Sequence, residues 1–548
     1  MTVEQQAVHG VPASPGRAAG PVLRLREPAR VSIGQPARYP KPLDYREEAA
    51  RIHPAADLVA AALTDKAALA TGEARDILHM TAVMATDPSL LGTAEELVTE
   101  HGLPAARAVW DAAEQFIDGL AEAGGYLAER TGDLRDVRDR IIEELTGAQS
   151  SAVPELDTPH VLLARELAPA DTAALDSATV LAIVTEEGGP TSHTAIIARA
   201  LGIPAVVGCT GALGLTADYL RVDGETGLVE VVTEGEAEAA PSTSTPEWNG
   251  VGSTGDGVRI PLLANIGSAA DAIKAADSPA EGVGLFRTEF CYLAMESEPT
   301  VEEQAEMYRA IIAVFHGKPC IVRTLDAGAD KPLTFLPAEA EPNPALGVRG
   351  LRMARQHQPE LLDRQLHAIR AAGGDSVMAP MVATTEEAAW FAERARAAGI
   401  RRVGVMIEVP SAALQAGELL EIVDFISIGT NDLTQYTMAA DRQLGTLAAL
   451  GDPWQPALLR LIELIGTAGR EAGKPVGVCG EAAADPLLAC VLVGLGATSL
   501  SMTPIALDAV GAELAKHAHS ACVTAAQAAA RARTPAEARA AVRTALGR

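Results

Sequence analysis

From Val258 onward, short apolar runs typical of β-strands alternate with helical patterns eight times. Eight βα units in about 290 residues match the size and rhythm of a TIM (β/α)8 barrel. The sequence therefore predicts such a barrel over residues 258–548. The eight runs are Leu262–Ile266, Gly282–Arg287, Cys320–Leu325, Val377–Met381, Val403–Glu408, Phe425–Gly429, Val476–Cys479 and Thr498–Met502.

The N-terminal half shows two other patterns. Between about Asp44 and Glu144, apolar residues recur at spacings of three and four in an Ala/Leu/Glu/Arg-rich stretch, which predicts several helices. From about Pro159, short apolar strands alternate with helices and end in a hairpin at Tyr219–Val232. We expect the N-terminal segment to add a strand to this small α/β domain, so that the helices form an insertion.

A polar segment punctuated by proline, residues 233–257, separates these regions from the predicted barrel. Such a composition is typical of a linker and permits relative motion of the domains on either side. The expected division is an α/β domain of residues 1–30 and 146–232, a helical subdomain of residues 31–145, the linker, and the barrel of residues 258–548.

The composition excludes several classes of protein. The chain has 44 Lys and Arg against 72 Asp and Glu, a net charge of −28, and no long basic cluster, so nucleic-acid binding is not expected. Six scattered cysteines without a C-x-x-C pair argue against a disulfide framework or a zinc knuckle.

One uncharged run, Pro486–Leu507, approaches membrane-spanning length. Its glycine, serine and proline residues and its helix–turn–strand rhythm favour a buried helix followed by a strand. Because Met1–Gly10 lacks an apolar stretch, we expect no secretory signal and no membrane association, and a cytoplasmic location.

Polar residues gather where the predicted barrel strands end, which is where TIM barrels hold their active sites. Guanidinium groups suit phosphate and carboxylate oxygens, and Glu408 and Asp432 offer the hard oxygen ligands that Mg²⁺ prefers. Together they predict a site for a small, multiply charged phosphate ester, although any one of them could instead form a structural ion pair. The candidates are Arg287, Arg323, Glu408, Asn431, Asp432, Arg442 and Cys479.

Cys479 has two interpretations. A cysteine at a strand end is commonly a small buried apolar residue. Beside arginines and carboxylates, however, a thiol whose ordinary pKa lies near 8.5 could protonate a carbanion-like enolate.

A glycine-rich segment, Gly188–Thr194, follows a strand-like run and opens the predicted helix Thr191–Leu201. Thr191 and Ser192 are favourable N-cap residues, so His193 is expected near the positive end of the helix dipole with free N–H groups close by. This setting suits a nucleophilic imidazole that would carry a phosphoryl group.

These motifs resemble phosphoenolpyruvate–protein phosphotransferase, the Enzyme I family of the bacterial sugar phosphotransferase system, over nearly the whole chain. The segments that carry the resemblance are Gly188–Thr194, Glu281–Phe290, Val322–Asp326, Asn343-Pro344 with Gly347 and Arg349, Val405–Pro410, Ser427–Tyr436 and Cys479–Glu481.

The resemblance implies a swivelling phosphohistidine domain with an inserted helical subdomain, ahead of the barrel. It implies His193 as the phosphohistidine and Cys479 as the proton donor that gives pyruvate, with Mg²⁺ on Glu408 and Asp432. The helices would dock a histidine-containing phosphocarrier protein, and the barrel would form a homodimer. Phosphoenolpyruvate would be bound by Arg287, Arg323, Asn431, Asp432 and Arg442.

Two alternatives remain open at this point. A pyruvate,phosphate dikinase or phosphoenolpyruvate synthase relative would share the histidine segment and the barrel, but it needs a nucleotide-binding domain. Only 192 residues precede His193, and they contain no P-loop. A non-catalytic phosphoenolpyruvate sensor would need neither a nucleophile nor a proton donor.

Overall fold

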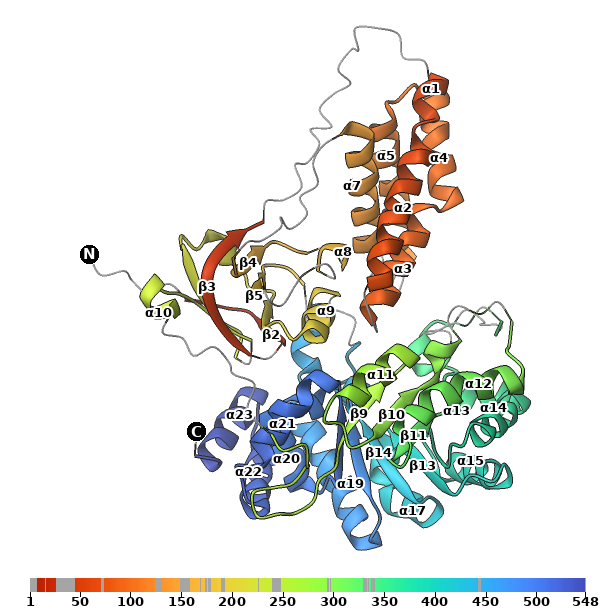
Figure 1. Ribbon diagram of the computed structural model, residues 1–548, viewed down its shortest axis with the longest axis vertical. Coiled ribbons are helices and arrows are strands. Elements are labelled where there is room, and N and C mark those ends of the chain that lie inside the picture. Colours follow the sequence, from red (N-terminus) through yellow and green to blue (C-terminus); the bar gives the residue numbers. More distant parts are fainter. Residues whose placement is uncertain are drawn as a thin grey trace. The chain divides into compact units, whose positions relative to one another are not determined.

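The computed structural model contains two compact units, Met1–Ser244 and Thr245–Arg548, and each is described by itself (Figure 1). It describes the chain except for residues 1–6, 15, 26–44, 70–72, 124–130, 148–157, 168, 173–174, 176–178, 189–192, 225, 239–247, 293–294, 296, 329–332, 334, 337–340, 442–444 and 548.

The second unit is a closed barrel of parallel strands, in the cyclic order β9 to β16 (Figure 1). Because both faces of each strand are covered, the strands read as continuous apolar runs, and the predicted runs agree with them to within two residues at either end. The predicted TIM barrel is confirmed. The strands are β9 (Leu262–Ile266), β10 (Val283–Arg287), β11 (Cys320–Arg323), β12 (Ser376–Ala379), β13 (Arg402–Ile407), β14 (Phe425–Gly429), β15 (Val476–Cys479) and β16 (Ser499–Met502).

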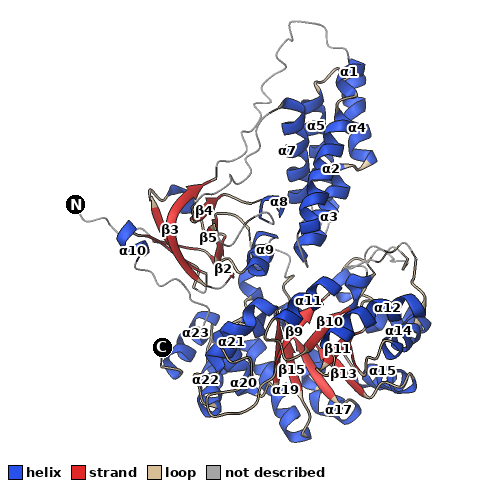
Figure 2. Cartoon of the chain, in the orientation of Figure 1, coloured by secondary structure: helices blue, strands red, loops and turns tan. Residues whose placement is uncertain are grey.

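Helices surround the strands of the barrel (Figure 2). Several begin where the sequence supplies a cap: Thr300 and Glu303 form a capping box before α12, and Asp485 accepts from two backbone N–H groups at the start of α20. The helices are α11 (Ala269–Asp277), α12 (Val301–Ile312), α13 (Leu351–His357), α14 (Pro359–Ala371), α15 (Thr385–Ala397), α16 (Pro410–Leu414), α17 (Ala416–Ile422), α18 (Thr430–Met438), α19 (Pro456–Ala472), α20 (Pro486–Leu495), α21 (Leu507–Leu514), α22 (His519–Arg531) and α23 (Pro535–Ala545).

The strands pack a different set of residues on each face. Residues that point outward form one large core with the surrounding helices. The alternate positions form a small separate cluster, as expected for the inside of a barrel. Its buried members are Leu285, Met378, Met406, Phe425 and Cys479. Cys479 therefore belongs to the filled interior of the barrel at the end of β15.

The uncharged run Pro486–Leu507 folds as predicted, into α20 and β16 followed by a short turn. Apart from Pro486 and Gly494, the residues of α20 are buried against the neighbouring helices and strands. Within the part of the chain that the structure describes, no helix combines the length and the apolar character that a membrane crossing requires.

The first unit contains a mixed sheet of order β1-β8-β7-β3-β4-β5-β6-β2. In its middle, β3 pairs in parallel with β4 and antiparallel with β7, so the predicted contribution of an N-terminal strand is confirmed. The elements are β1 (Ala7–His9), β2 (Val11–Ser14), β3 (Arg17–Arg24), β4 (His160–Ala164), β5 (Val180–Thr185), β6 (Ala205–Val207), β7 (Tyr219–Asp223), β8 (Leu228–Val231), α8 (Pro169–Thr172), α9 (His193–Leu201) and α10 (Glu234–Glu238).

Between β3 and β4 the chain forms a bundle of helices with its own apolar core (Figure 2). The helical period predicted this region. Asp87 caps α4, and Pro88 follows it as the first residue of the helix, a position that proline favours. Because β3 and β4 are neighbours in the sheet, the bundle is an insertion into the α/β fold. Its helices are α1 (Tyr45–Ala49), α2 (Ile52–Leu69), α3 (Glu73–Ala85), α4 (Pro88–Thr99), α5 (Ala105–Ala123) and α7 (Thr131–Thr146).

A partly buried ion network joins the bundle to the α/β part of this unit. Arg140 on α7 donates to Asp136 and to Asp171 of α8, each over 2.9 Å. Burial, opposed by Arg140, raises the pKa of Asp136 to about 6. Helix α8 packs on α9, so this network fixes the bundle against the region in which α9 begins.

Candidate active site at the strand ends of the barrel

Two buried arginines lie at the centre of the site. Arg323, the last residue of β11, is 5% exposed and forms ion pairs with Glu289 and, over 3.4 Å, with Asp326. Burial opposes its positive charge, but the carboxylates of Glu289, Asp326 and Glu408 raise the pKa of Arg323 above its usual range. This guanidinium therefore stays charged within the protein interior.

Arg349 connects two segments that are far apart in the sequence. Its guanidinium donates to both carboxylate oxygens of Asp326 over 3.1 and 3.0 Å, and to both of Asp432 over 3.3 Å. Arg349 is 1% exposed, and Asp432 lies in the first turn of α18. Asp432, a predicted ligand of substrate and metal, is thus held by a guanidinium fork.

Glu408 follows β13 and is 1% exposed. One of its oxygens accepts the backbone N–H of Met381 over 2.7 Å, and Met381 adopts a left-handed φ of 57°, which is rare for a residue with a side chain. Burial, together with the charges of Asp432 and Asp326, raises the pKa of Glu408 to about 7. Repulsion among these buried carboxylates marks the place as one where a cation would be stabilised.

The absence of a side chain at Gly429 allows this close grouping of polar groups. A Cβ at Gly429, the last residue of β14, would lie 2.7 Å from a carboxylate oxygen of Glu408. A side chain at this position would therefore force the carboxylate out of its place.

Two buried polar atoms in the site have no partner among the residues that the structure describes. They are Nε of Arg323 and Oε2 of Glu289, which lie on the two members of the same ion pair. Buried polar atoms in native proteins nearly always have partners, so these two are open to a ligand at the strand ends.

Cys479, the last residue of β15, is 1% exposed and has two hydrogen bonds. Its thiol donates to the carbonyl oxygen of Ile428 over 3.4 Å and accepts from the hydroxyl of Ser427 over 3.3 Å. Burial raises the pKa of Cys479, the Ser427 hydrogen bond lowers it, and the nearby charges of Glu408 and Arg323 act in opposite directions. The thiol is therefore protonated near neutral pH and lies among the charged groups of the site.

The structure brings most of the predicted site residues together. Arg287 ends β10 and acts electrostatically on Cys479, as do Arg323 and Glu408, while Asn431 accepts the hydroxyl of Thr430 over 3.4 Å. Arg442 lies outside the described residues.

The predicted phosphohistidine belongs to the other unit. The structure gives His193 as the first residue of α9, and Gly189 to Ser192 of the predicted anion-binding segment lie outside the described residues. Behind this helix start, the hydroxyl of Thr194 donates to the carbonyl oxygen of Leu167 over 3.2 Å. This bond ties the first turn of α9 to the chain before α8.

Three residues that shape the site were not among the predicted ligands: Glu289, Asp326 and Arg349. Glu289 and Asp326 follow the barrel strands closely, so the rule that selected the others places them at the same rim, although it did not single them out as ligands. Arg349 lies in a connection far from any strand end, and only its place in an Asn-Pro-x-x-Gly-x-Arg pattern marked it.

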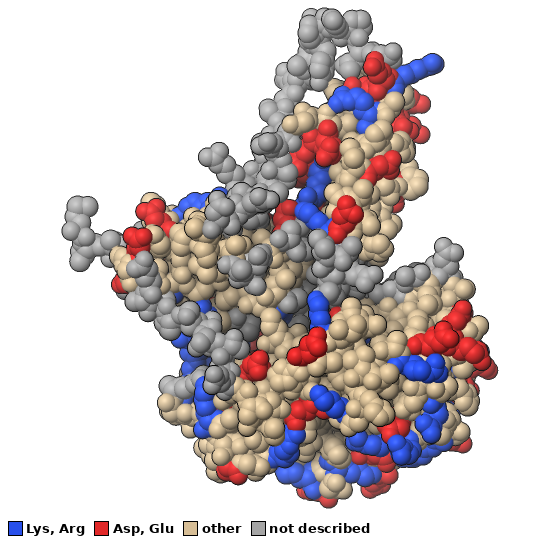
Figure 3. Space-filling view, in the orientation of Figure 1, with Lys and Arg blue, Asp and Glu red and all other residues tan. Residues whose placement is uncertain are grey.

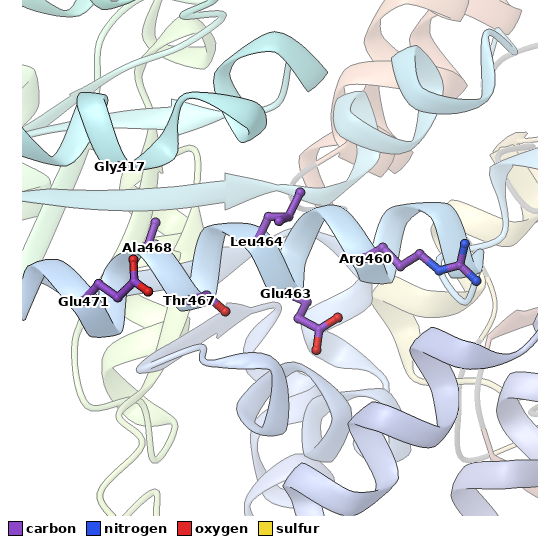
Figure 4. Close-up of a pocket in the computed structure, with 7 residues that line it drawn as sticks. All are labelled: Gly417, Arg460, Glu463, Leu464, Thr467, Ala468 and Glu471. Carbon is purple, nitrogen blue, oxygen red and sulfur yellow. The ribbon is translucent and has the colours of Figure 1, made fainter.

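A hollow of about 580 Å³ lies elsewhere in this unit, on the outer surface along α19 (Figure 4). Its lining includes Arg460, Glu463, Leu464 and Glu471, whose side chains project from one helix, and none of the predicted site residues. Acidic and basic side chains also alternate over the face of this unit drawn in Figure 3, without a continuous basic patch.

Three family descriptions match successive parts of the chain. Residues 9–130 match "PEP-utilising enzyme, N-terminal", residues 156–227 match "PEP-utilising enzyme, mobile domain", and residues 247–519 match "PEP-utilising enzyme, PEP-binding domain". The site described above lies within the last of these.

Several curated proteins named phosphoenolpyruvate-protein phosphotransferase are similar to this chain. One from Streptomyces coelicolor is 49% identical over 99% of both chains. One from Haloferax volcanii is 40% identical over 78% of this chain and 80% of its own length. One from Geobacillus stearothermophilus is 36% identical over 94% of both chains.

Proposed function

The chain belongs to the phosphoenolpyruvate-protein phosphotransferase family, and on that premise we propose how its own residues perform the transfer. The phosphoryl group of phosphoenolpyruvate moves to His193 and then to a histidine-containing phosphocarrier protein, and pyruvate is released. This is the first step of sugar uptake by the phosphotransferase system, carried out in the cytoplasm.

The observation that carries the proposal is the grouping of Arg323, Glu408, Asp432 and Cys479 at one end of the barrel, with polar atoms on Arg323 and Glu289 that have no partner among the described residues. A guanidinium with a free donor, carboxylates that repel one another and a protonated thiol suit an anionic substrate whose product needs a proton. A sensor would bind the same ligand without needing the thiol.

In the proposed reaction, Arg287, Arg323, Arg442 and Asn431 hold the phosphate and carboxylate oxygens of the substrate. The bond between phosphorus and the enol oxygen breaks, and a bond from phosphorus to a ring nitrogen of His193 forms. The enolate that leaves takes the proton of the Cys479 thiol at its methylene carbon and becomes pyruvate. The arginines offset the charge that spreads over the transferring group.

The carboxylates of Glu408 and Asp432 fit a divalent cation, because their mutual repulsion within a buried site would be relieved by one. Within the described residues, no group of three or more His, Cys, Asp or Glu side chains is arranged around a common point. Two protein ligands, completed by substrate oxygens and water, are the usual way in which proteins hold Mg²⁺. When bound, Mg²⁺ would neutralise charge on the phosphoryl group during transfer.

The remaining parts of the proposal follow from the family. The helical subdomain of residues 31–145 docks the phosphocarrier protein, and the α/β domain of residues 1–30 and 146–232 carries the phosphohistidine. The linker of residues 233–257 allows that domain to reach both the barrel and the carrier, and the barrel of residues 258–548 forms the homodimer. Sedimentation of the full chain at several concentrations tests the last point.

The proposal is tested by incubating the protein with phosphoenolpyruvate labelled in its phosphate, in the presence of Mg²⁺. Acid-labile label on the peptide that contains His193 is expected, and it should disappear in His193→Ala while phosphoenolpyruvate binding persists. His316→Ala, an exposed histidine of the barrel unit, serves as the matched control. Label that persists in His193→Ala contradicts the proposal, and binding without any label supports a sensor. Label that appears only with ATP supports a dikinase.

A further inference from the structure

We propose that Ser427 is a positioning residue for proton transfer, whose hydroxyl holds the sulfur of Cys479 and stabilises the thiolate that forms when the proton leaves. The inference rests on the proposed role of Cys479 as proton donor. It adds Ser427 to the residues that take part in that step. It follows from the way in which two neighbouring barrel strands place a hydroxyl against a sulfur.

Ser427 and Cys479 lie on adjacent parallel strands, β14 and β15, with Ser427 opposite Gly477 and Cys479 opposite Gly429. The hydroxyl oxygen of Ser427 is 3.3 Å from the sulfur of Cys479, within the range of a hydrogen bond to sulfur. The side chains are 4% and 1% exposed, so water does not compete for this bond.

The hydrogen-bond acceptor of the Ser427 hydroxyl is unusual for a buried serine. Ser427 pairs with Met406 on β13, and Met406 and Cys479 belong to the apolar cluster that fills the barrel. A buried hydroxyl normally donates to an oxygen, because a neutral thiol is only a weak acceptor. A thiolate is a strong acceptor, so this donor is placed for the charged form of the sulfur more than for the resting one.

In the resting protein, the thiol of Cys479 both donates one hydrogen bond and accepts another. Its own proton is directed to the carbonyl oxygen of Ile428 over 3.4 Å, while its sulfur accepts from Ser427. When the thiol turns to give its proton to a substrate carbon, the bond to Ile428 is lost and the bond from Ser427 remains. A donor that is fixed before charge develops stabilises that charge without reorganisation.

The charged groups that act on Cys479 do not replace this bond. Arg287 at the end of β10 and Arg323 at the end of β11 favour the thiolate, while Glu408 after β13 disfavours it. Burial also disfavours the thiolate and is the largest influence. Among the groups that act on the sulfur, Ser427 is the one hydrogen-bond donor recorded within the described residues.

The proton-transfer step balances as follows. The S–H bond of Cys479 breaks, and the electron pair of the enolate double bond forms the new C–H bond of the pyruvate methyl group. Sulfur keeps the electrons of the S–H bond and becomes a thiolate, which accepts the Ser427 hydrogen bond until solvent supplies a new proton. In the reverse direction the thiolate removes a methyl proton from pyruvate.

The reverse direction gives a test that does not depend on His193. The full-length protein is incubated with pyruvate, Mg²⁺ and inorganic phosphate in D₂O, and the loss of the methyl proton signal is followed by NMR. Ser427→Ala is expected to slow this exchange about ten- to a hundredfold, as for loss of a hydrogen bond to a charged group. Ser499→Ala, a serine opposite Gly477 on the next strand, is the matched control and should exchange like the unchanged protein.

Two further measurements separate positioning from a general structural effect. The rise of the exchange rate with pH, which reports formation of the thiolate, should move to higher pH by about one unit in Ser427→Ala. In a Cys479→Ser background, adding Ser427→Ala should lower the remaining rate by less than about twofold, because residues that act as a unit are not additive.

The outcomes distinguish the inference from the function on which it rests. If Cys479→Ser exchanges as fast as the unchanged protein, the proposed proton donor is wrong. If Cys479→Ser loses exchange while Ser427→Ala keeps both its rate and its pH profile, only the role of Ser427 is overturned. The role of Ser427 is likewise overturned if the losses of exchange rate from the two substitutions add in the double variant and the pH profile is unchanged.

Discussion

Two networks of charged side chains among the described residues, one in each unit, differ in how deeply they are buried. In the first unit, Arg140 and the neighbouring Lys66 face Asp133, Asp136 and Asp171, and the side chains of Arg140, Asp136 and Asp171 are 16%, 10% and 14% exposed. In the barrel, Arg323 and Arg349 face the carboxylates of Glu289, Asp326, Glu408 and Asp432, and none of these six residues is more than 7% exposed.

The difference shows what each network is suited to. A network that solvent partly reaches, between a helical insertion and its parent sheet, holds two parts of one unit in a fixed arrangement. The barrel network is buried and its carboxylates repel one another at Glu408, which is costly for the ligand-free protein and is relieved by a cation and a ligand. The barrel network therefore indicates a binding site, and the network of the first unit indicates a structural joint.

Replacing one of the mutually repelling carboxylates of the barrel is expected to give the largest effect. Glu408→Gln should lower pyruvate formation from phosphoenolpyruvate about a thousandfold, because a proposed cation ligand is lost. The same change should raise the free energy of unfolding of the ligand-free barrel, because a buried carboxylate that other carboxylates repel has been removed. A coupled assay of pyruvate and thermal unfolding measure the two effects.

Glu421→Gln, an exposed carboxylate on α17, is the matched control and should change neither quantity. Activity that survives in Glu408→Gln would remove this residue from the catalytic site and weaken the contrast between the two networks.

Removing one cation from each network compares their contributions to stability directly. Arg349→Met should destabilise the barrel by about 3–5 kcal/mol, because Asp326 and Asp432 lose their shared partner within the interior. Arg140→Met should destabilise the first unit by about 2 kcal/mol, since its side chain is 16% exposed and solvent compensates in part. Urea unfolding followed separately for each unit by hydrogen exchange measures both losses, and an equal loss in the two units would remove the distinction.

The joint of the first unit should also respond to pH. Because the pKa of Asp136 is raised to about 6, the folded state binds more protons than the unfolded state between about pH 4 and pH 6. The contribution of this carboxyl is therefore full below pH 4 and is lost as the pH rises through 6. Relative to the unchanged protein, Asp136→Asn should gain about 2–3 kcal/mol of stability across that window.

Urea midpoints of the two proteins, measured at several pH values between about 3 and 7 (a range of about one unit beyond each pKa), give this difference. A difference that does not vary with pH would mean that Asp136 ionises as it does in the unfolded chain, and the joint would then be less buried than the structure indicates.

The smallest expected effect comes from relieving backbone strain in the barrel at Ala439, which involves no buried charge. Ala439 is exposed and ends α18, the helix that carries Asp432, with a left-handed φ of 49°. Ala439→Gly should stabilise the barrel by about 1 kcal/mol without changing activity, because glycine adopts this conformation freely. Ala540→Gly, within α23, should instead cost about 1 kcal/mol, and thermal unfolding compares the two.

The barrel and its strand ends were predictable for a physical reason. Strands of a closed parallel barrel are buried on both faces, so the sequence marks them as apolar runs between helices. Once eight such runs were placed, their carboxyl ends had to meet at one rim, and Arg323 and Glu408 fell there. The helical insertion was predictable in the same way, because the spacing of its apolar residues changes to that of helices and then changes back to that of strands.

Contacts within the site were not predictable in the same way. The sequence offered Asp432 as a free ligand, whereas the structure pairs it with Arg349, 83 residues away. It offered Cys479 without its partner Ser427, and it gave no sign that Met381 takes a left-handed conformation to reach Glu408.

By itself, the sequence determined the number and order of the elements, the insertion of the helices, and which residue types meet at the barrel rim, because burial and turn chemistry are written into local patterns. The tertiary structure alone decided which of those side chains pair with one another, and which of their polar atoms have no partner in the part of the chain that the structure describes. Those pairings depend on the register of neighbouring strands and on ångström-scale distances between segments that are remote in the chain, and no local pattern encodes them.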